Sequence, residues 1–183
     1  MSIDGKWFLD EPLTATGVML DGWNFTMGAP YHGDPPVKCE QYQKGVEVPV
    51  AFGGLDTPYL RKEIGEQLIL IDPKGVQTFP VSVVGTKNQY LIVNVIRIID
   101  AIHSSSEIEY YSDKDKSEDS DLSLRYKYVR HLILDSSCIQ SDTHIFRTKY
   151  HTNDIFVSEI IKQAIDLICP NHGGIFSEIS VAG

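Results

Sequence analysis

Cysteine is scarce in this chain of 183 residues, and its three cysteines follow no pattern that would cross-link them or bind a metal. Cys39, Cys138 and Cys169 are odd in number and widely spaced, and no Cys-x-x-Cys pair occurs. A disulfide framework needs paired cysteines, and a zinc knuckle needs closely spaced ones. We therefore expect reduced, mostly buried thiols in a chain long enough to bury a core without cross-links.

Long apolar runs and an excess of basic charge are also lacking. No apolar stretch reaches the roughly 20 residues of a membrane span, and the N-terminus has no cationic segment followed by an apolar one. The 25 acidic side chains outnumber the 16 basic ones, for a formal net charge of −9 at pH 7. Because Lys and Arg bind phosphates and anionic lipids, we expect no nucleic acid and no membrane as partners. A cytoplasmic protein with a basic protein partner fits better.

The signatures of common catalytic sites are absent as well. The sequence has no Gly-x-Ser-x-Gly, no His-Glu-x-x-His and no phosphate-binding glycine pattern. Histidines and aspartates gather in the last third, at spacings that match no metal-ligand set: His131, Asp142, His144, His151, Asp154 and His172. We predict no catalytic residue, no metal and no cofactor. A small metal-dependent hydrolase and a ligand-binding regulatory domain are kept as alternatives.

Two helices are predicted from capping residues and apolar spacing. The first covers residues 58–68, where Thr57 can cap the helix and Pro58 suits its first position. The second covers residues 159–168, whose apolar side chains form a single stripe after the capping residue Ser158. Both helices should pack one apolar face on the core.

Alternating apolar residues predict two antiparallel hairpins. The first joins strands at 76–84 and 89–95 through a turn that contains glycine. The second joins strands at 124–134 and 144–150 across the polar residues 135–142. The hairpins place most strands next to their neighbours along the chain.

The remaining strands are expected to be short. Residues 6–52 alternate apolar bursts with Gly, Pro and Asp, which favours short strands and turns, and residues 175–181 predict a last strand. Strands and helices do not alternate in the βαβ order of a parallel sheet. We therefore predict an α+β fold of antiparallel hairpins with a few segregated helices, in a single domain over residues 1–183.

The run from Tyr90 to Ala101 is almost unbroken in its apolar character and is interrupted only by Asn94, Arg97 and Asp100. Burying these polar side chains is costly unless each finds a partner. Residues 96–102 can continue the strand or form a short helix. We favour the helix, because Arg97 and Asp100 would then lie three residues apart on one helix face and could pair.

Residues 104–121 form the one compositional break, with six serines, seven acidic residues and two lysines. Because few apolar residues follow Tyr111, we predict a mobile surface loop. The loop is either a solvated linker or an electrostatic attractor for a cationic partner. In the second interpretation, the partner-binding residues are the carboxylates of the loop and the residues that flank it: Glu107, Glu109, Tyr110, Tyr111, Asp113, Asp115, Glu118, Asp119 and Asp121.

Three motifs occur in a recognisable order: the run 90–101, Ile145-Phe146-Arg147, and Ile155-Phe156-Val157-Ser158-Glu159 leading into a helix and a Gly-x-Phe ending. They resemble an immunity-protein family of bacterial polymorphic toxin systems, first catalogued as a domain of unknown function and typified by a Myxococcus member. Leu20-Asp21-Gly22-Trp23 followed by Gly28 resembles its N-terminal portion. The resemblance spans roughly residues 20–176, with the acidic insertion and the segment 169–176 as departures.

The resemblance implies an antitoxin-like binding module that neutralises one cognate toxin by forming a stable complex, and it implies no catalytic residues. Combined with the negative charge, it favours a basic toxin such as a nuclease, whose groove an acidic surface can occupy. The polar residues of the motifs are then expected to be structural: Asn94, Arg97, Asp100, Arg147 and Ser158.

Overall fold

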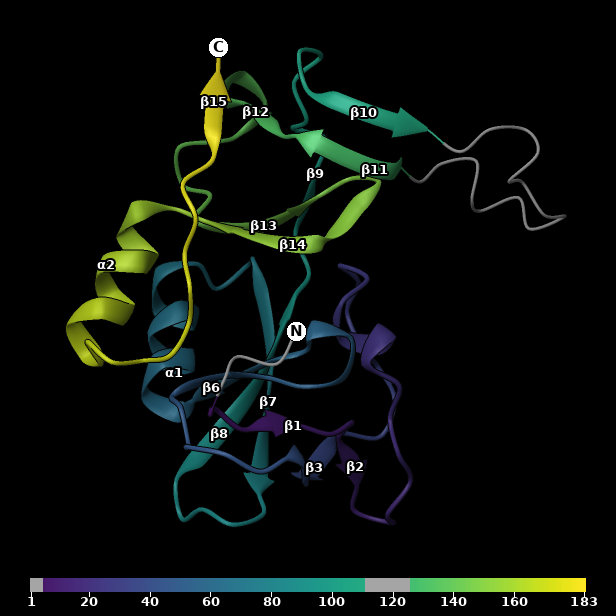
Figure 1. Ribbon diagram of the computed structural model, residues 1–183, viewed down its shortest axis with the longest axis vertical. Helices are drawn as coiled ribbons and strands as arrows, with labels where there is room; N and C mark the ends of the chain where they lie inside the picture. The colour runs from purple at the N-terminus through teal and green to yellow at the C-terminus, as the bar shows by residue number, and fades with distance from the viewer. Residues whose placement is uncertain (1–4, 111–125) are drawn as a thin grey trace, which may run out of the picture.

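A six-stranded sheet forms the centre of one half of the computed structural model, which describes residues 5–110 and 126–183 (Figure 1). Its order is β2-β3-β7-β8-β6-β5, and only β3 and β7 pair in parallel. The strands are β2 (Leu13–Thr14), β3 (Pro36–Cys39), β5 (Val50–Phe52), β6 (Pro58–Arg61), β7 (Val76–Val83) and β8 (Gln89–Val95). The β7–β8 pair confirms the first predicted hairpin.

The other half of the fold contains a three-stranded sheet in the order β14-β13-β9 (Figure 1). Its strands are β9 (Ile98–Ile99), β13 (Ile145–Thr148) and β14 (His151–Val157). Three two-stranded pairs complete the fold: β1 (Phe8–Leu9) with β4 (Gln41–Gln43), β10 (Glu107–Tyr110) with β11 (Tyr126–His131), and β12 (Ile133–Asp135) with β15 (Ser180–Ala182). The predicted α+β class, with mostly antiparallel sheets and few helices, is confirmed.

Two α-helices, α1 (Lys62–Ile71) and α2 (Glu159–Ile168), lie side by side next to the sheets (Figure 1). Three short 3-10 helices are η1 (Gly22–Phe25), η2 (Gly54–Asp56) and η4 (Ser136–Cys138). The bounds of α2 agree with the prediction, because its apolar stripe is anchored in the core. Neither α1 nor α2, nor any other helix in the described ranges, has the length and apolar character needed to cross a membrane.

The first helix begins later than predicted, because Pro58–Arg61 form strand β6. This strand lies between β5 and β8, and its Tyr59 and Leu60 are buried. Pairing on both sides outweighs the local helix signal, and Pro58 is tolerated at the first strand position. Thr57 does not cap the helix: its hydroxyl donates to the carbonyl of Gly54 at 2.8 Å.

The short helix favoured over 96–102 is wrong, because the chain stays extended there. Ile98 and Ile99 pair in parallel with Arg147 and Thr148 of β13, and Ile102 forms a bridge with Leu134. The extended backbone hydrogen-bonds to two other strands. A helix in this place would leave the backbone groups of those strands unpaired. Arg97 and Asp100 therefore do not meet as a helical pair.

The second predicted hairpin is also wrong in its pairing. Its first strand is split into β11 and β12, which pair with β10 and β15, and its second strand, β13, pairs with β14 and β9. The partners are distant in sequence and could not be chosen from local turn signals. Of the predicted last strand over 175–181, only residues 180 and 181 belong to a strand, β15.

The segment predicted to be an acidic loop contains a strand near its start. Glu107–Tyr110 form the strand β10 and are not part of a loop. Residues 111–121 of that predicted loop lie outside the described residues, as do Tyr111, Asp113, Asp115, Glu118, Asp119 and Asp121.

Strand β8 separates the two main groups of buried apolar side chains. Tyr90 and Ile92 belong to one cluster, with the N-terminal aromatics, and Leu91, Val93 and Val95 belong to the other, with both helices. Successive side chains of a strand point to opposite faces. Burial on both faces explains why this segment reads as an almost continuous apolar run.

Replacing Ile161 by alanine tests the packing of α2 on this core. Ile161 is completely buried, so Ile161→Ala should lower the free energy of unfolding by about 3 kcal/mol through lost contacts and a cavity. Leu167, on the same helix, is 85% exposed, and Leu167→Ala should change the free energy of unfolding by less than about 0.5 kcal/mol. Urea titrations of both variants measure the difference. Equal losses would contradict the assigned orientation of α2.

Candidate functional site

Asn94 lies in the interior of the fold and connects β8 to the N-terminal segment. Its amide nitrogen donates to the carbonyl of Ala29 at 2.9 Å and lies 3.3 Å from the Gln77 side-chain oxygen. Gln77 in turn exchanges two hydrogen bonds with the backbone of Tyr31, at 2.8 and 2.9 Å. Asn94, although it interrupts the apolar run, therefore holds the irregular segment that contains Ala29 and Tyr31.

Arg97 pairs with Asp72, and sequence reasoning missed Asp72. This aspartate ends α1, and its buried carboxylate accepts hydrogen bonds from the Arg97 guanidinium and from the backbone amides of His144 and Ile145. Burial alone would raise the pKa of Asp72, but these donors hold that pKa below its usual value. Only the position of Asp72 after an apolar helix could have signalled this role.

Asp100 points to a different partner from the one expected. Its carboxylate lies 3.4 Å from the ammonium nitrogen of Lys149, and both side chains are about half exposed. An exposed pair of this kind contributes little to stability. The expected Arg97–Asp100 pair is thus replaced by one buried pair and one surface pair.

Arg147 is almost completely buried on β13, at 1% exposure. One guanidinium nitrogen donates to the backbone carbonyls of Thr152 and Asn153, while Nε and Nη2 have no hydrogen-bond partner in the described part of the chain. Burial lowers the pKa of Arg147 to about 10, although the charges of Asp154 and Asp56 oppose the shift. Arg147 therefore remains protonated at neutral pH and closes the turn between β13 and β14.

Ser158 stands at the N-cap of α2, but its side chain does not cap the helix. Its hydroxyl lies 3.1 Å from Nδ1 of His144. Two other histidines of the last third have separate partners: His151 lies 2.9 Å from the Asp154 carboxylate, and His172 lies 3.1 Å from the Asp166 carboxylate. Within residues 5–110 and 126–183, no three His, Cys, Asp or Glu side chains are grouped to hold a metal.

The three thiols are unpaired and differ in their surroundings. Cys39 is buried, Cys169 is half-buried and Cys138 is exposed, so the expectation of mostly buried thiols is wrong for Cys138. Burial raises the pKa of Cys39 to about 11, because its thiolate would be poorly solvated. Cys39 is therefore a protonated core residue at neutral pH, unsuited to act as a nucleophile.

The β10–β11 ribbon presents an aromatic surface next to the undescribed acidic segment. Tyr110 and Tyr128 are 64% and 59% exposed. The rings of Tyr110, Tyr126 and Tyr150 pack edge to face in series, with centroids 5.5 and 5.8 Å apart. Such partly exposed, preordered aromatic side chains are typical anchors of protein interfaces.

The charge of the β10–β11 ribbon is more balanced than its sequence predicts. Glu109 lies 3.3 Å from the Lys127 ammonium and 3.4 Å from the Arg130 guanidinium on the neighbouring strand. Glu107, at the far end of β10, is exposed. The described part of the ribbon therefore offers mainly aromatic area, and most acidic residues of the predicted loop lie in the sequence between its two strands.

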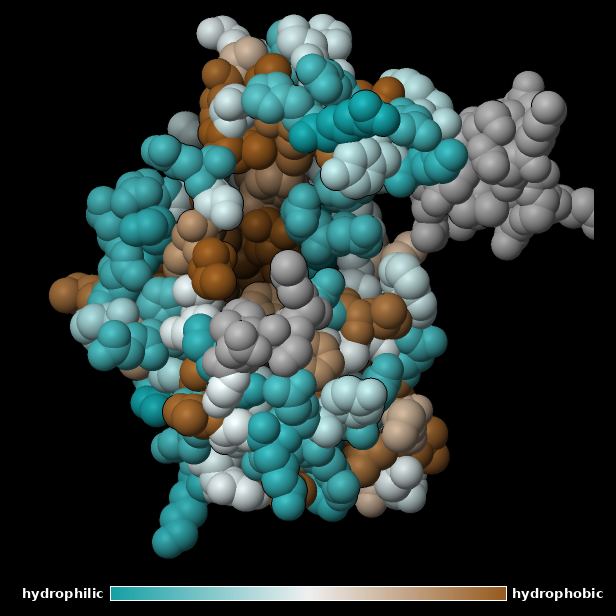
Figure 2. Space-filling model, in the orientation of Figure 1, coloured by the Kyte–Doolittle hydropathy of each residue, from teal (hydrophilic) through white to brown (hydrophobic). Residues whose placement is uncertain are grey.

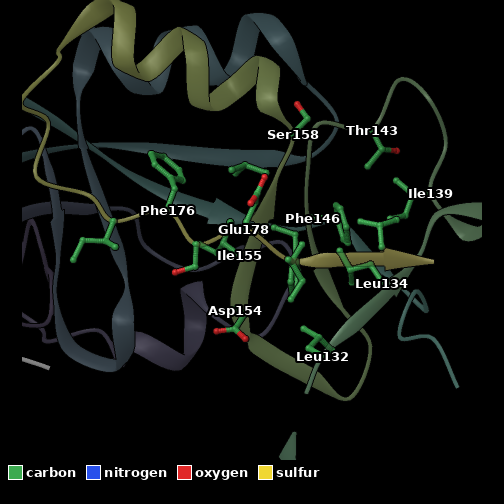
Figure 3. Close-up of a pocket in the computed structure, with 16 residues that line it drawn as sticks. Leu132, Leu134, Ile139, Thr143, Phe146, Asp154, Ile155, Ser158, Phe176 and Glu178 are labelled. Atoms are coloured by element: carbon green, nitrogen blue, oxygen red, sulfur yellow. The ribbon is translucent and has the colours of Figure 1, made fainter. Parts of the chain in front are cut away.

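An apolar groove of about 530 Å³ opens between the β13–β14 sheet, the β12–β15 pair and the C-terminal strap, which we define as residues 175–179 (Figures 2 and 3). Its volume is within the range of binding sites. Most of its wall is apolar, and Asp154, Ser158 and Glu178 supply polar groups (Figure 3). The apolar lining includes Leu132, Leu134, Ile139, Phe146, Ile155, Phe156, Phe176 and Ile179. Sequence reasoning missed the groove, because its walls come from four separate segments.

Residues 66–175 of the chain match the Immunity protein family (Imm11). The matched region is more than half of the chain and contains the buried Asp72–Arg97 pair, the β10–β11 ribbon and most of the groove. No curated protein matches the chain.

Neutralising Asp72 tests the buried ion pair. Asp72→Asn leaves the Arg97 charge without its partner and should lower the free energy of unfolding by about 3 kcal/mol at pH 7. Because the folded-state pKa of Asp72 is lowered, its stabilisation is present above the unfolded-state value of about 4 and is lost as the pH falls below it. Denaturant titrations from pH 7 to pH 3 should show the two proteins converging in acid.

The matched control for this experiment is Asp100→Asn, which removes an exposed carboxylate instead of a buried one. It should change the stability by less than about 1 kcal/mol at any pH. A constant difference between wild type and Asp72→Asn across the whole pH range would contradict the assigned role of the carboxylate.

Proposed function

The chain belongs to the Immunity protein family (Imm11), and from this premise we propose that it binds one cognate bacterial toxin and neutralises it by covering the toxin's working surface. The match over residues 66–175 is the observation that carries this proposal. The protein contributes contact area and charge, and no reactive group of its own takes part. The toxin is the only partner that this function requires, and the cytoplasm is the compartment in which it would act.

The exposed tyrosines of the β10–β11 ribbon, and the acidic residues between its two strands in the sequence, support a role of this region in docking the toxin. Tyr110 and Tyr128 offer exposed aromatic area at low entropic cost, because Tyr110 is already ordered against Tyr126. The adjoining carboxylates, from Asp113 to Asp121, add negative charge that speeds encounter with a basic surface. Attraction is thus assigned to the acidic residues and anchoring to the exposed tyrosines.

The acidity of the chain favours a basic toxin, such as a nuclease that binds polyanions. A net charge of −9 repels nucleic acid but attracts a groove that is built to hold it. The simplest test is a pull-down and a growth assay with the toxin domain encoded beside the gene of this protein. The proposal requires a stable complex and rescue of growth, and it fails if the two proteins do not associate.

Removing the ribbon's aromatic side chains should weaken the complex. Tyr110→Ala and Tyr128→Ala should each raise the Kd for the toxin domain by about tenfold or more, because buried aromatic anchors contribute over 1 kcal/mol at interfaces. Tyr42→Ala is the matched control, since Tyr42 is 75% exposed on the distant strand β4 and should leave the Kd unchanged. Calorimetric titration measures the Kd of all three variants. Equal effects at the three positions would exclude the ribbon as the anchor.

Neutralising the acidic residues between β10 and β11 in the sequence should slow association without much change in dissociation. We expect the serine variant of Asp113, Asp115, Glu118, Asp119 and Asp121 to associate about tenfold more slowly at low salt and to lose its salt dependence. A control variant carries serine at five exposed carboxylates of the other half: Asp21, Asp34, Glu40, Glu63 and Glu66. Stopped-flow measurements compare the association rates of the two variants. Unchanged rates in the first variant would remove this segment from the docking surface.

A further inference from the structure

The groove differs from an ordinary surface hollow because it follows the edge of a strand. The last four residues of β14, from Asp154 to Val157, contribute to its wall, and Ser158 follows them. Side chains of consecutive strand residues point to opposite faces of a sheet, so a cavity that contacts all four must run along the strand's edge. In the described ranges, β14 is the outermost strand of its sheet and has no strand on that side.

The register of β13 and β14 identifies the backbone groups that this edge exposes. Ser158 donates its amide to the carbonyl of His144, and Phe146 lies opposite Phe156. In an antiparallel ladder, hydrogen-bonded pairs alternate with residues whose amide and carbonyl point away. Ile155 and Val157 therefore direct their backbone groups away from β13, and neither makes a backbone hydrogen bond elsewhere in the described structure.

The C-terminal strap crosses over this edge, and its backbone is anchored before and after it (Figure 3). Within the strap, the side chain of Phe176 packs against the core cluster that includes both helices. Before it, His172 is fixed by Asp166 and accepts a hydrogen bond from the amide of Gly174 at 3.0 Å. After it, β15 pairs with β12. Between these anchors, the strap makes no backbone hydrogen bond to any described residue. The strap can therefore shift outward without breaking a backbone hydrogen bond.

The side chains of the groove define the chemistry of its occupant. Exposed apolar side chains lie around the opening, with Ile175 at 74%, Val181 at 58% and Ile179 at 37% exposure. The charged groups at the groove are both carboxylates, Asp154 and Glu178, and among residues 5–110 and 126–183 no Lys or Arg side chain lines it. An apolar segment with a basic residue complements this surface in both hydrophobicity and charge.

We propose that the groove binds one extended segment of the toxin, which pairs its backbone with the outer edge of β14, places apolar side chains in the groove and sets a Lys or Arg beside Asp154 and Glu178. The proposal rests on the proposed function and deepens it. The β10–β11 ribbon attracts and anchors the toxin, and strand addition at β14 then supplies a second, shape-specific contact. Backbone pairing favours an extended peptide over a small molecule, because the exposed amides and carbonyls repeat along the strand.

Hydrogen exchange of the wild-type protein tests the proposal without any substitution. In the free protein, the amides of Ile155 and Val157 should exchange rapidly, because they face the open groove. In the complex with the toxin domain, both should exchange at least about tenfold more slowly, and the amides of residues 175–179 should also slow. Unchanged exchange at Ile155 and Val157 in a stable complex would overturn the proposal.

Two substitutions at one position separate the backbone from the side chain. Ile155→Pro and Ile155→Ala both remove the isoleucine side chain, but only proline removes the outward amide, and proline is tolerated at a strand edge. We expect Ile155→Pro to bind the toxin domain about three- to tenfold more weakly than Ile155→Ala. Circular dichroism shows whether both variants are folded. Equal Kd values for two folded variants would overturn the proposal.

The charge of the groove is tested by Glu178→Lys against Asp34→Lys. Both variants change the net charge equally, but Asp34 lies in an exposed turn of the other half. Glu178→Lys should raise the Kd at least about threefold more than Asp34→Lys does. Equal effects would count against a basic residue at this position.

The controls separate this proposal from the function on which it rests. If the wild-type protein does not bind the toxin domain at all, the proposed function fails. If it binds, and the ribbon variants weaken binding while Ile155→Pro and Glu178→Lys match their controls, the function holds and the groove is not the site. Overlapping peptides of the toxin domain then identify the segment: the proposal requires an apolar peptide with Lys or Arg that competes for the complex.

Discussion

The buried carboxylate of Asp72 is the contact on which the joining of the two halves depends. It ends α1, which packs on the six-stranded sheet, and it binds two amides at the start of β13 and the guanidinium of Arg97 just before β9. One side chain thus links a helix of the first half to two strands of the second. Separating a buried charge from its hydrogen-bond donors is costly, so this junction leaves little freedom for the halves to move.

The surfaces available for binding follow from how the second half is built. Its sheet has three strands only, so β14 keeps a free edge, and the chain must return over that edge to pair β15 with β12. The returning strap bridges the edge without filling the space beneath it, which leaves the groove. On the other side, β10 and β11 extend as a two-stranded ribbon and carry tyrosines that the small sheet cannot bury. A thin sheet with an open edge thus carries both of the proposed contact surfaces.

The position of the polar residues shows how stability and binding are divided in this chain. Asn94 and Arg147 are buried and Arg97 is half-buried, and each binds another part of the chain, while Glu107 and Tyr110 are exposed. The interior network explains why an apolar run tolerates polar interruptions, since each one binds a segment distant in sequence. The side chains of this network are occupied within the fold, and the proposed binding surfaces are composed of other residues.

Local patterns in the sequence determined the elements whose neighbours are close along the chain. The β7–β8 hairpin and α2 were predicted because their alternation, turn and apolar stripe are contained in one segment, and the family resemblance rested on such segments too. Tertiary structure alone decided that Pro58–Arg61 would be a strand, that Ile98 would pair with Arg147, and that Asp72 would meet Arg97. The physical reason is that strand partners and buried charges are chosen by whatever unpaired backbone or side chain the rest of the fold brings near, and that choice leaves no periodicity in the sequence.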